Sequence, residues 1–482
     1  MNIRAISKSL GIVLIINAIM MFLSAGVAAI NNFDTSFSPL LLSAIITSTV
    51  GIFPLIFVRE RNQIKLIEGY IIVFLGWLIS VIFGMLPYVM WGGDFTLINA
   101  WFECCSGYTT TGSTILTNIE SLPRGLLFWR SSTHFLGGIG VVVFILLLIP
   151  TLKSKYTQIS STDISDVSKD HYNQKTKQII NVRVFVYLGL NILMILILLL
   201  AGLPLFDAVN TSFATIATGG FHIKNASIAA YDSFLIEFIV SIFTLLASMH
   251  FGLLYLSLVN RKAKILTSNV TKFFLKFVFI SATIISLTLF IEGHYDTIWS
   301  SLRHGFFQTI TIVSTTGFAT ADTSQWPILT IFILLFLMLL GGCSGSTAGG
   351  VKADRLAIVL ASIKASIKKQ AHQNAIIPVK LGKDIVNSKL VNSVLTFTAL
   401  YISLIIIFMF AYALCGMPML ESFTGSLAIM SNVGPGFGSI GSVGNFADIS
   451  TVAKFLMGIQ MIIGRIEIYP LLIIFTLLYK RK

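Results

Sequence analysis

VSTTGFAT, residues Val313–Thr320, lies between two long apolar segments, yet it is rich in Thr and Gly. A helix that crosses a membrane gains little from such residues, because they add almost no apolar surface. Related stretches occur three more times, as TTTGST at 109–114, ATGGFH at 217–222 and SNVGPGFG at 431–438. Alignment on one glycine places Gly112, Gly220, Gly317 and Gly434 roughly 100 residues apart, a longer period than the roughly 20–50 residues of short solenoid repeats.

The amino-acid composition places the chain in a membrane. Of its 482 residues, 55% are hydrophobic and only 11% are charged, against about 25% charged in soluble domains. Apolar runs of about 20 residues, the length that crosses a bilayer, recur along the whole chain. The first run, Leu10–Ile30, is longer than a signal-peptide core and no convincing A-x-A cleavage site follows it, so we expect it to remain as a helix.

The net charge of +13 indicates the orientation of the chain rather than a nucleic-acid partner. Lys and Arg concentrate in segments that the positive-inside rule places in the cytoplasm. These segments are 59–65, 153–183, 261–264, 364–383 and 479–482. The loops between them are poor in Lys and Arg, and we expect them outside and both termini inside. The acids of these outer loops are Asp34, Asp94, Asp232, Asp322 and Asp448.

Two helices come first, near 10–30 and 38–58, and one pattern then repeats four times. Each unit has a long apolar segment, a shorter semi-apolar segment, a Thr/Gly stretch and a second long apolar segment. The first long segments lie near 66–91, 184–204, 271–292 and 389–415, and the second near 124–151, 233–260, 326–363 and 451–479. The predicted divisions are the N-terminal pair, 1–62, and four units at 63–165, 166–265, 266–385 and 386–482.

Each shorter segment is predicted to be a half-helix that enters the membrane from outside. Gly and Pro, which end helices well, precede it in GMLPY, GLPLFD and GMPMLE, whereas the third unit has EGHYD. An acid then opens each segment, where we expect it to cap free N–H groups and offset the helix dipole. These acids are Asp94, Asp207, Asp296 and Glu421. A segment of about three turns is too short to span, so the Thr/Gly stretch returns the chain.

Each unpaired backbone group at membrane depth costs several kcal/mol, so non-helical backbone persists there only where it is buried in protein or lines water. Four such stretches in one chain therefore suggest one common site. If they meet around one axis, their carbonyls can replace the hydration shell of a cation, and each half-helix directs its partly negative end at the centre. A carbonyl cage without formal charge favours a monovalent cation, K⁺ before Na⁺. The expected K⁺ ligands are Thr110, Thr111, Gly112, Thr218, Gly219, Gly220, Thr315, Thr316, Gly317, Asn432, Val433 and Gly434.

Together with GGCSGSTAGGVK at 341–352 and IIGRIEIYP at 462–470, the four stretches resemble the Trk/Ktr/HKT superfamily of potassium transporters, above all its bacterial Trk branch. The resemblance covers essentially the whole chain. It implies an all-α polytopic membrane protein with four M1–pore helix–M2 repeats around one pseudo-fourfold pore, plus two N-terminal transmembrane helices. It further implies a homodimer in the bacterial inner membrane, and potassium selectivity where all four glycines are present. His222 departs from the small polar residue that is more usual there.

A gate is expected below the third stretch, where a ten-residue Gly/Ser/Thr run interrupts the second helix. With a cost near 1 kcal/mol for each interior Gly, the run is predicted to be unwound, and the resemblance implies an intramembrane gating loop. The predicted gating loop comprises Gly341, Gly342, Cys343, Ser344, Gly345, Ser346, Thr347, Ala348, Gly349 and Gly350.

Arg465, midway along the last apolar segment, is expected to face the pore as an electrostatic barrier. An ion pair with Glu467 is the alternative, but residues at i and i+2 do not share a helical face.

No catalytic constellation is recognisable, so we do not expect an enzyme. The four cysteines and seven histidines lack metal-ligand spacing, and the chain has no nucleotide-binding motif in the required context. The resemblance implies that a cytoplasmic ring of TrkA-like RCK domains binds NAD(H) or ATP/ADP instead. The alternative function is a proton- or sodium-coupled symporter on the same fold, for which Glu103 is the one plausible titratable group. We expect Glu103 to pack behind the selectivity filter, that is, behind the expected K⁺ ligands.

Overall fold

The computed structural model describes residues 2–58, 66–148, 176–260, 264–372, 374–382 and 384–468. Within these ranges the regular structure is helical apart from one short antiparallel hairpin, β1 (Lys380–Leu381) and β2 (Asp384–Ile385). The all-α prediction is therefore confirmed with this small exception. The predicted boundaries at 62/63 and 165/166 fall outside the described residues, and the division of the chain into units stays a prediction.

The helices follow the predicted order of one pair and four units. The N-terminal pair is α1 (Ile3–Ile30) and α2 (Phe37–Phe57). The first long segments are α3 (Leu66–Gly84) with α4 (Leu86–Trp91), α9 (Thr176–Leu200), α14 (Asn269–Ile291) and α18 (Ser388–Leu414). The half-helices are α5 (Leu97–Tyr108), α10 (Leu205–Ile216), α15 (Ile298–Val313) and α19 (Met419–Met430).

The second segments are less regular than the first. They are α6 (Arg124–Leu148), α11 (Phe234–Ala247) with α12 (Phe251–Val259), α16 (Ile328–Leu340) with α17 (Ala353–Ala371), and α20 (Thr451–Ile466). A four-residue helix, α13 (Lys264–Thr267), precedes α14. One 3₁₀ turn precedes each second segment, and these turns are Ile119–Ser121, Ser227–Tyr231, Thr323–Gln325 and Gly438–Ile440.

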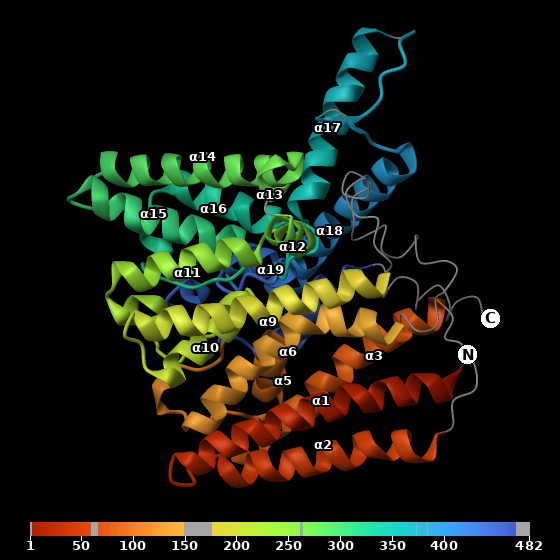
Figure 1. Ribbon diagram of the computed structural model, residues 1–482. Coiled ribbons are helices and arrows are strands. Elements are labelled where there is room, and N and C mark those ends of the chain that lie inside the picture. The colour runs from red at the N-terminus through yellow and green to blue at the C-terminus, as the bar shows by residue number, and fades with distance from the viewer. Residues whose placement is uncertain are drawn as a thin grey trace.

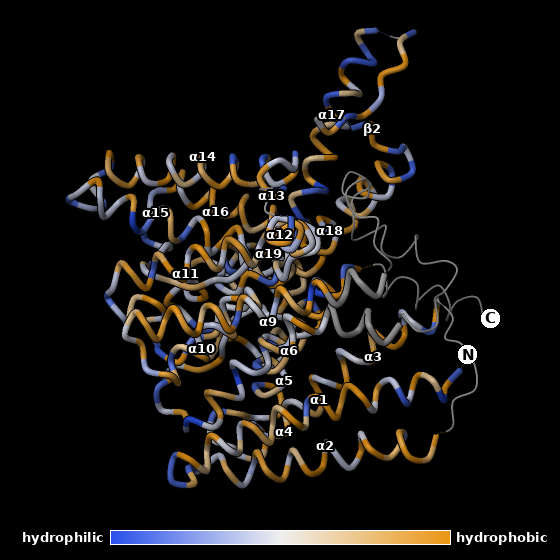
Figure 2. Tube along the Cα trace, viewed as in Figure 1, coloured by the Kyte–Doolittle hydropathy of each residue, from blue (hydrophilic) through white to orange (hydrophobic). Residues whose placement is uncertain are grey.

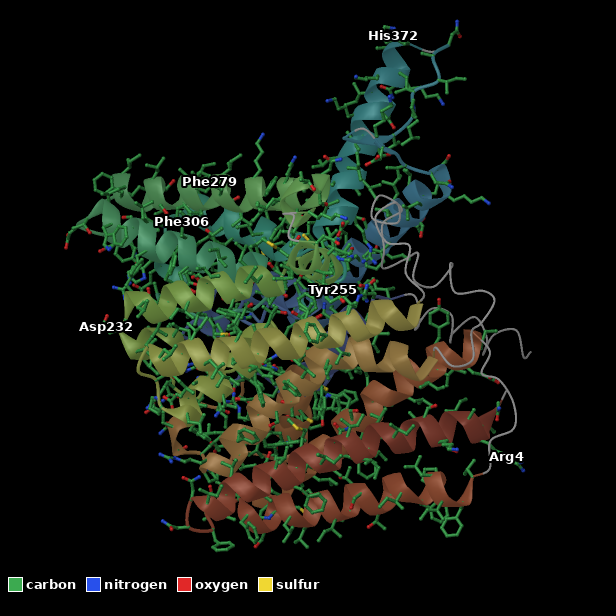
Figure 3. All side chains as sticks on the ribbon, viewed as in Figure 1. Arg4, Asp232, Tyr255, Phe279, Phe306 and His372 are labelled. Carbon is green, nitrogen blue, oxygen red and sulfur yellow. The ribbon has the colours of Figure 1, made fainter. Side chains whose placement is uncertain are left out.

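The long helices lie side by side, and α17 projects away from the bundle (Figure 1). Apolar residues dominate the helices, whereas polar residues concentrate at their ends and at the tip of α17 (Figure 2). Arg4 and Asp232 lie at opposite ends of the bundle (Figure 3), as expected if one end faces the cytoplasm and the other the outside. His372 lies beyond the bundle at the end of α17.

Among the described residues, six helices are long and apolar enough to cross a membrane, and the bent pair α11–α12 adds a seventh. The continuous helix predicted over 233–260 is wrong, because the chain bends by 101° between these two helices. The predicted interruption of 326–363 is present, since residues 341–352 separate α16 from α17. Of the segment predicted over 451–479, α20 covers Thr451–Ile466 and is followed by Glu467 in a left-handed conformation, and the part after residue 468 lies outside the described residues.

The acids predicted to cap the half-helices do not do so. Thr96 and Thr297 cap α5 and α15, each accepting a hydrogen bond from the backbone N–H three residues later. The other two half-helices begin directly after a proline and have no side-chain cap. Asp207 instead accepts a hydrogen bond from Tyr231 Oη at 3.1 Å. The error arose because an acid near a helix start can bind another loop instead of its own helix.

Small residues bring α1 against α2. A Cβ placed on Gly11 would lie 2.6 Å from the carbonyl oxygen of Gly51, and one on Gly51 would lie 3.0 Å from the carbonyl oxygen of Gly11. This close backbone approach follows the packing mode of membrane helices, in which small residues let helices meet. The same helix α1 also packs on α3 and α6, and so joins the N-terminal pair to the first unit.

Replacement of Gly11 by Val is predicted to destabilise the folded protein by about 1–3 kcal/mol, because the added side chain overpacks the α1–α2 contact. The same change at Gly26 is the matched control, since nothing lies within 4 Å of a Cβ at that position. Thermal unfolding in detergent checks the prediction. Equal melting temperatures for the two variants would show that the contact between α1 and α2 is looser than described.

Candidate functional site

The four Thr/Gly stretches, called the filter loops here, share one backbone conformation. The residue two positions before the aligned glycine is left-handed in each loop, with φ of 52° at Thr110, 53° at Thr218, 60° at Thr315 and 53° at Asn432. The glycine itself has a φ between 78° and 104°. Since a β-branched residue rarely adopts positive φ, three threonines held in this conformation indicate a strong constraint from the surrounding structure.

Each filter loop begins with the same hydrogen-bonded turn. The N–H of the residue before the glycine donates to a carbonyl five positions earlier, as from Thr111 to Ser106 at 2.9 Å and from Val433 to Ala428 at 2.9 Å. The two other loops repeat this bond at 2.8 Å. This is the Schellman pattern, which satisfies free carbonyls at a helix end, so each half-helix ends in a turn that pairs one of its last carbonyl groups.

The four aligned glycines form a closed ring. A Cβ on any of them would clash with the carbonyl oxygen of the residue before the glycine in the next loop. The clashes are Gly112 with Gly219 at 2.2 Å, Gly220 with Thr316 at 1.9 Å, Gly317 with Val433 at 2.1 Å and Gly434 with Thr111 at 2.5 Å. Because the fourth loop meets the first, the loops surround one axis in chain order, and no other residue type fits at these positions without movement.

Polar contacts close the seam between the fourth loop and the first. Ser113 Oγ donates to the carbonyl oxygen of Gly434 at 2.9 Å. The Asn432 amide donates to Thr111 Oγ1 at 3.0 Å and to the carbonyl oxygen of Met461 at 3.1 Å. The ring is therefore held by side chains of the loops themselves and by α20.

His134 of α6 closes the seam between the first loop and the second. Its Nδ1 lies 2.8 Å from the carbonyl oxygen of Gly107, and its Nε2 accepts the N–H of Phe221 at 3.0 Å. These two bonds require the neutral ring with its proton on Nδ1. The imidazole also stacks on Phe221 with 4.2 Å between ring centres.

Glu103 lies behind the first filter loop, as expected. It is fully buried and accepts hydrogen bonds from Thr114 Oγ1 at 3.0 Å, from the N–H of Ile115 at 3.0 Å and from Arg130 Nε at 2.9 Å. Arg130 in turn donates from Nη1 to the carbonyl oxygen of His222 at 3.1 Å. The ion pair therefore ties the first loop to the second.

A cavity of about 110 Å³ opens outside the ring. The glycines of the first three filter loops and Pro435 of the fourth line it, and so does His222. This histidine is 5% exposed, and its Nδ1 accepts the N–H of Lys224 at 3.1 Å. His222, the departure noted from the family pattern, therefore lies at this outer cavity, two residues after the aligned glycine.

Residues 341–350, the candidate gate, cross from one unit to the next on the other side of the ring. The N–H of Cys343 donates to the carbonyl oxygen of Ser248 at 2.8 Å. Thr347 Oγ1 donates to the carbonyl oxygen of Ile216 at 2.9 Å. The N–H of Gly349 donates to Thr315 Oγ1 at 2.7 Å. The candidate gate therefore binds the inner ends of the second and third half-helices and the break after α11.

Arg465 also binds the candidate gate. It is 7% exposed, and its Nη1 donates to the carbonyl oxygen of Thr347 at 2.7 Å while Nη2 lies 3.4 Å from the carbonyl oxygen of Gly137. Glu467, the alternative partner considered from the sequence, forms an ion pair with Arg355 of α17 instead. A buried cation that binds carbonyl oxygens of two different units thus lies beside the loop.

Two charged residues that follow the candidate gate in the chain also bind it. Lys352 donates from Nζ to the carbonyl oxygen of Ala348, and Asp354 accepts the N–H of Ser344. Both are buried. His134 and Arg130 were missed, although a signal was present, since charged or polar residues inside an apolar segment such as α6 normally have a functional or structural partner.

Comparison with known proteins agrees with this geometry. Residues 40–481 match the family model TrkH, described as a cation transport protein. The chain belongs to the TrkH family. Among curated relatives, the Trk system potassium uptake protein TrkH of Salmonella typhimurium is 31% identical over the full length of both chains. The Trk system potassium uptake protein TrkG of Escherichia coli is 32% identical, over 87% of this chain and 86% of its own.

A solved structure extends the match to the fold. The crystal structure of the potassium transporter TrkH from Vibrio parahaemolyticus superposes with a TM-score of 0.87 at 27% identity, covering 98% of both chains. The predicted architecture of four M1–pore helix–M2 repeats and two N-terminal transmembrane helices is therefore confirmed, as is the family named from the sequence motifs.

Replacement of Glu103 by Gln is predicted to destabilise the protein by about 3–5 kcal/mol, because Arg130 would remain buried without its counter-charge. The measurement is thermal unfolding of the purified protein in detergent. Glu292→Gln is the matched control, since Glu292 is exposed at the end of α14. A melting temperature for Glu103→Gln no lower than that of the control would mean that the ion pair contributes nothing to the loop arrangement.

Proposed function

We propose that this protein mediates potassium uptake across the cell membrane through a gated, channel-like pore. The observation that carries the proposal is the closed ring of four glycines, each adjacent to a carbonyl of the next loop. The relatives in the TrkH family are named as potassium uptake proteins, which supports the same cation. Membrane potential, worth about 2.3 kcal/mol per charge per 100 mV, is sufficient to drive accumulation.

The backbone of the filter loops supplies the K⁺ ligands in this proposal. Carbonyl oxygens of each aligned glycine and of the two residues before it replace the water around the ion. Gly112 argues for potassium, because the resemblance implies potassium selectivity where all four aligned glycines are present. The half-helices add the partly negative ends of their dipoles, which favour a cation at the centre without any buried carboxylate in contact with it.

Residues 341–350 act as the gate in this proposal. The loop is fixed by hydrogen bonds to Ser248, Ile216 and Thr315, so opening requires these bonds to break together. Arg465 adds a positive charge below the filter loops, where it raises the barrier to a cation. The bond from Arg465 to Thr347 further couples this charge to the position of the loop.

We also propose a homodimer in the bacterial inner membrane, with both termini in the cytoplasm. The distribution of Lys and Arg supports this orientation. A TrkA-like ring of RCK domains that binds NAD(H) or ATP/ADP is the proposed regulatory partner, and the family membership supports it. The basic cytoplasmic segments, including the exposed residues of α17, provide its docking surface.

Cation flux into liposomes that contain the purified protein alone tests the proposed function. A K⁺ gradient and then a Na⁺ gradient are imposed, each with and without a pH gradient. K⁺ flux that follows the electrical potential and ignores the pH gradient is expected. K⁺ flux that disappears without a proton or sodium gradient would identify the symporter instead, although Glu103, the acid considered for coupling, is buried in an ion pair behind the filter loop.

Replacement of Gly112 by Ser is predicted to lower the K⁺/Na⁺ permeability ratio by about tenfold, equivalent to ~1.4 kcal/mol. The added Cβ would lie 2.2 Å from the carbonyl oxygen of Gly219, so a proposed ion ligand must move. Reversal potentials or competitive flux in liposomes give the ratio. Gly189→Ser is the matched control, because no atom lies within 4 Å of a Cβ there. An unaltered ratio in folded Gly112→Ser would remove the first loop from the filter.

Replacement of Arg465 by Ala is predicted to raise K⁺ flux several-fold, since it removes a positive charge from the path and the hydrogen bond to Thr347. Liposome flux at matched protein density is the measurement. Arg4→Ala is the control, because Arg4 is an exposed cation at the start of α1. Unchanged or lower flux in folded Arg465→Ala would contradict the barrier role.

A further inference from the structure

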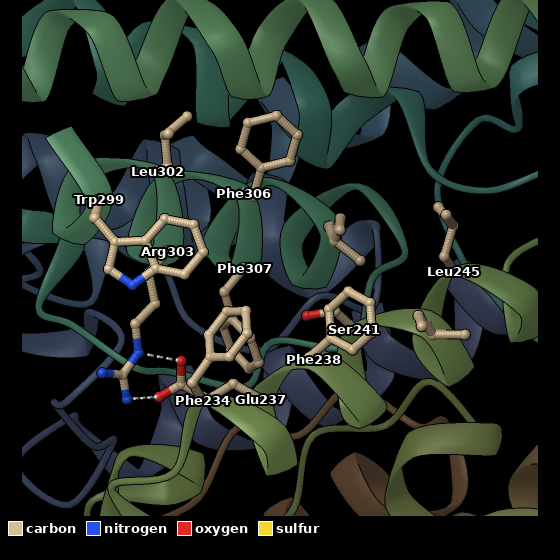
Figure 4. A pocket seen from close by; sticks show the side chains of 12 residues that line it. Phe234, Glu237, Phe238, Ser241, Leu245, Trp299, Leu302, Arg303, Phe306 and Phe307 are labelled. Carbon is tan, nitrogen blue, oxygen red and sulfur yellow. Dashed lines mark hydrogen bonds and ion pairs between the residues drawn. The ribbon is translucent and has the colours of Figure 1, made fainter.

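A groove of about 270 Å³ lies between α11 and α15, away from the filter loops. Phe238, Ile242 and Leu245 of α11 line one wall, and Phe306, Phe307 and Ile310 of α15 line the other. Figure 4 shows aromatic rings along the groove, with Arg303 and Glu237 joined at one end and Leu245 at the other. The groove therefore has an apolar body and one charged end.

The position of the groove indicates hydrocarbon as its surroundings. Phe238 is 52% exposed and Trp299 is 58% exposed, on helices of a protein that crosses a membrane. Such apolar exposure at membrane depth faces lipid rather than water. The groove runs from Glu237 to Leu245, a distance of roughly 12 Å at 1.5 Å per helical residue, which suits an extended acyl chain.

The charged end of the groove offers both signs of charge. Arg303 is partly exposed, and Glu237 accepts from its Nε at 2.7 Å and from its Nη2 at 2.8 Å. Among the described residues no partner binds Nη1, which leaves this nitrogen able to donate. Asp232 Oδ1 lies 3.7 Å from Arg303 Nη2, and the side chain of Asp232 is 95% exposed. Trp299 stands beside them, and tryptophan is enriched where a membrane meets water.

We propose that this groove binds a phospholipid of the outer leaflet whose headgroup carries a phosphate and a primary ammonium, as in phosphatidylethanolamine. One acyl chain lies between α11 and α15. The phosphate accepts a hydrogen bond from Arg303 Nη1, and the ammonium pairs with Asp232. A headgroup with a phosphate alone would place three negative groups, the phosphate, Glu237 and Asp232, beside the single guanidinium of Arg303. The ammonium supplies the second positive charge, so it is the feature that selects the lipid.

The bound lipid would act on the gate, a consequence that rests on the proposed function. Both helices that line the groove hold the candidate gate at their inner ends. Ala247 and Ser248, at the end of α11, accept hydrogen bonds from Thr347 and Cys343, and Thr315, shortly after α15, accepts one from Gly349. A chain between the two helices fixes their separation, and so fixes the bonds that keep the candidate gate in place.

Photo-crosslinking of the full chain in vesicles tests the site. The probe is phosphatidylethanolamine with a diazirine midway along one acyl chain, and the labelled peptides are identified by mass spectrometry. Label is expected to concentrate on 234–245 and 299–310. The reference surface is the exposed apolar face of α18, with Ile402, Ile406 and Phe410. Label on the groove no greater than on this face would overturn the proposal, because it would show only bulk lipid.

Two variants test the binding of the acyl chain and the binding of the headgroup separately. Ser241→Trp fills the groove and is expected to abolish the excess label, whereas Ser403→Trp on α18, the matched control, leaves it unchanged. Asp232→Asn is expected to lower the preference for phosphatidylethanolamine over a phosphatidylglycerol probe by about fivefold, the range of an exposed ion pair. Equal labelling of the wild-type groove by the two lipids would overturn the headgroup assignment.

K⁺ flux of the same variants tests the action on the gate. Flux through Ser241→Trp is expected to differ from wild type in vesicles that contain phosphatidylethanolamine, and to lose its dependence on that lipid. If label disappears while flux is unchanged, the lipid site stands and its action on the gate is wrong. If wild-type protein shows no K⁺ flux at all, the proposed function fails, and the labelling experiment still decides whether the site exists.

Discussion

Backbone that leaves a helix at membrane depth has no water to bind, and this constraint governs the centre of the molecule. Four half-helices end there, and each ends in the same turn, in which an N–H returns to a carbonyl five positions earlier. The turn requires positive φ at Thr110, Thr218, Thr315 and Asn432. The aligned glycines, two residues later, then contact carbonyl oxygens of the neighbouring loops. The conformation at the end of each half-helix therefore depends on that of the next loop, around the whole ring.

The same constraint explains the buried charges around the ring. A charge in a low-dielectric region is costly unless it is paired and hydrogen-bonded. Glu103 and Arg130 satisfy each other and also hold the backbone of the first and second filter loops. Arg465 binds two carbonyl oxygens from different units. These charges therefore fix the relative positions of loops that have no regular structure to hold them.

The four units are alike at the filter loops and differ in their second helices. The α6 helix runs unbroken from Arg124 to Leu148, whereas the second unit breaks between α11 and α12 and the third between α16 and α17. The two breaks meet, because Cys343 binds the carbonyl oxygen of Ser248. The departure from fourfold symmetry thus lies at the candidate gate, whereas the ring of filter loops keeps the fourfold pattern.

The sequence by itself determined the helical membrane fold, the four repeats, the aligned glycines and the interruption at 341–350, because these depend on local composition and on a period that recurs along the chain. It did not determine the break at Ser248, the caps at Thr96 and Thr297, or the partners of Glu103, Arg130 and Arg465. Those features depend on contacts between residues far apart in the chain, such as Arg465 with Thr347. A single sequence records which groups need a partner, whereas only the packed helices decide which partner each one reaches.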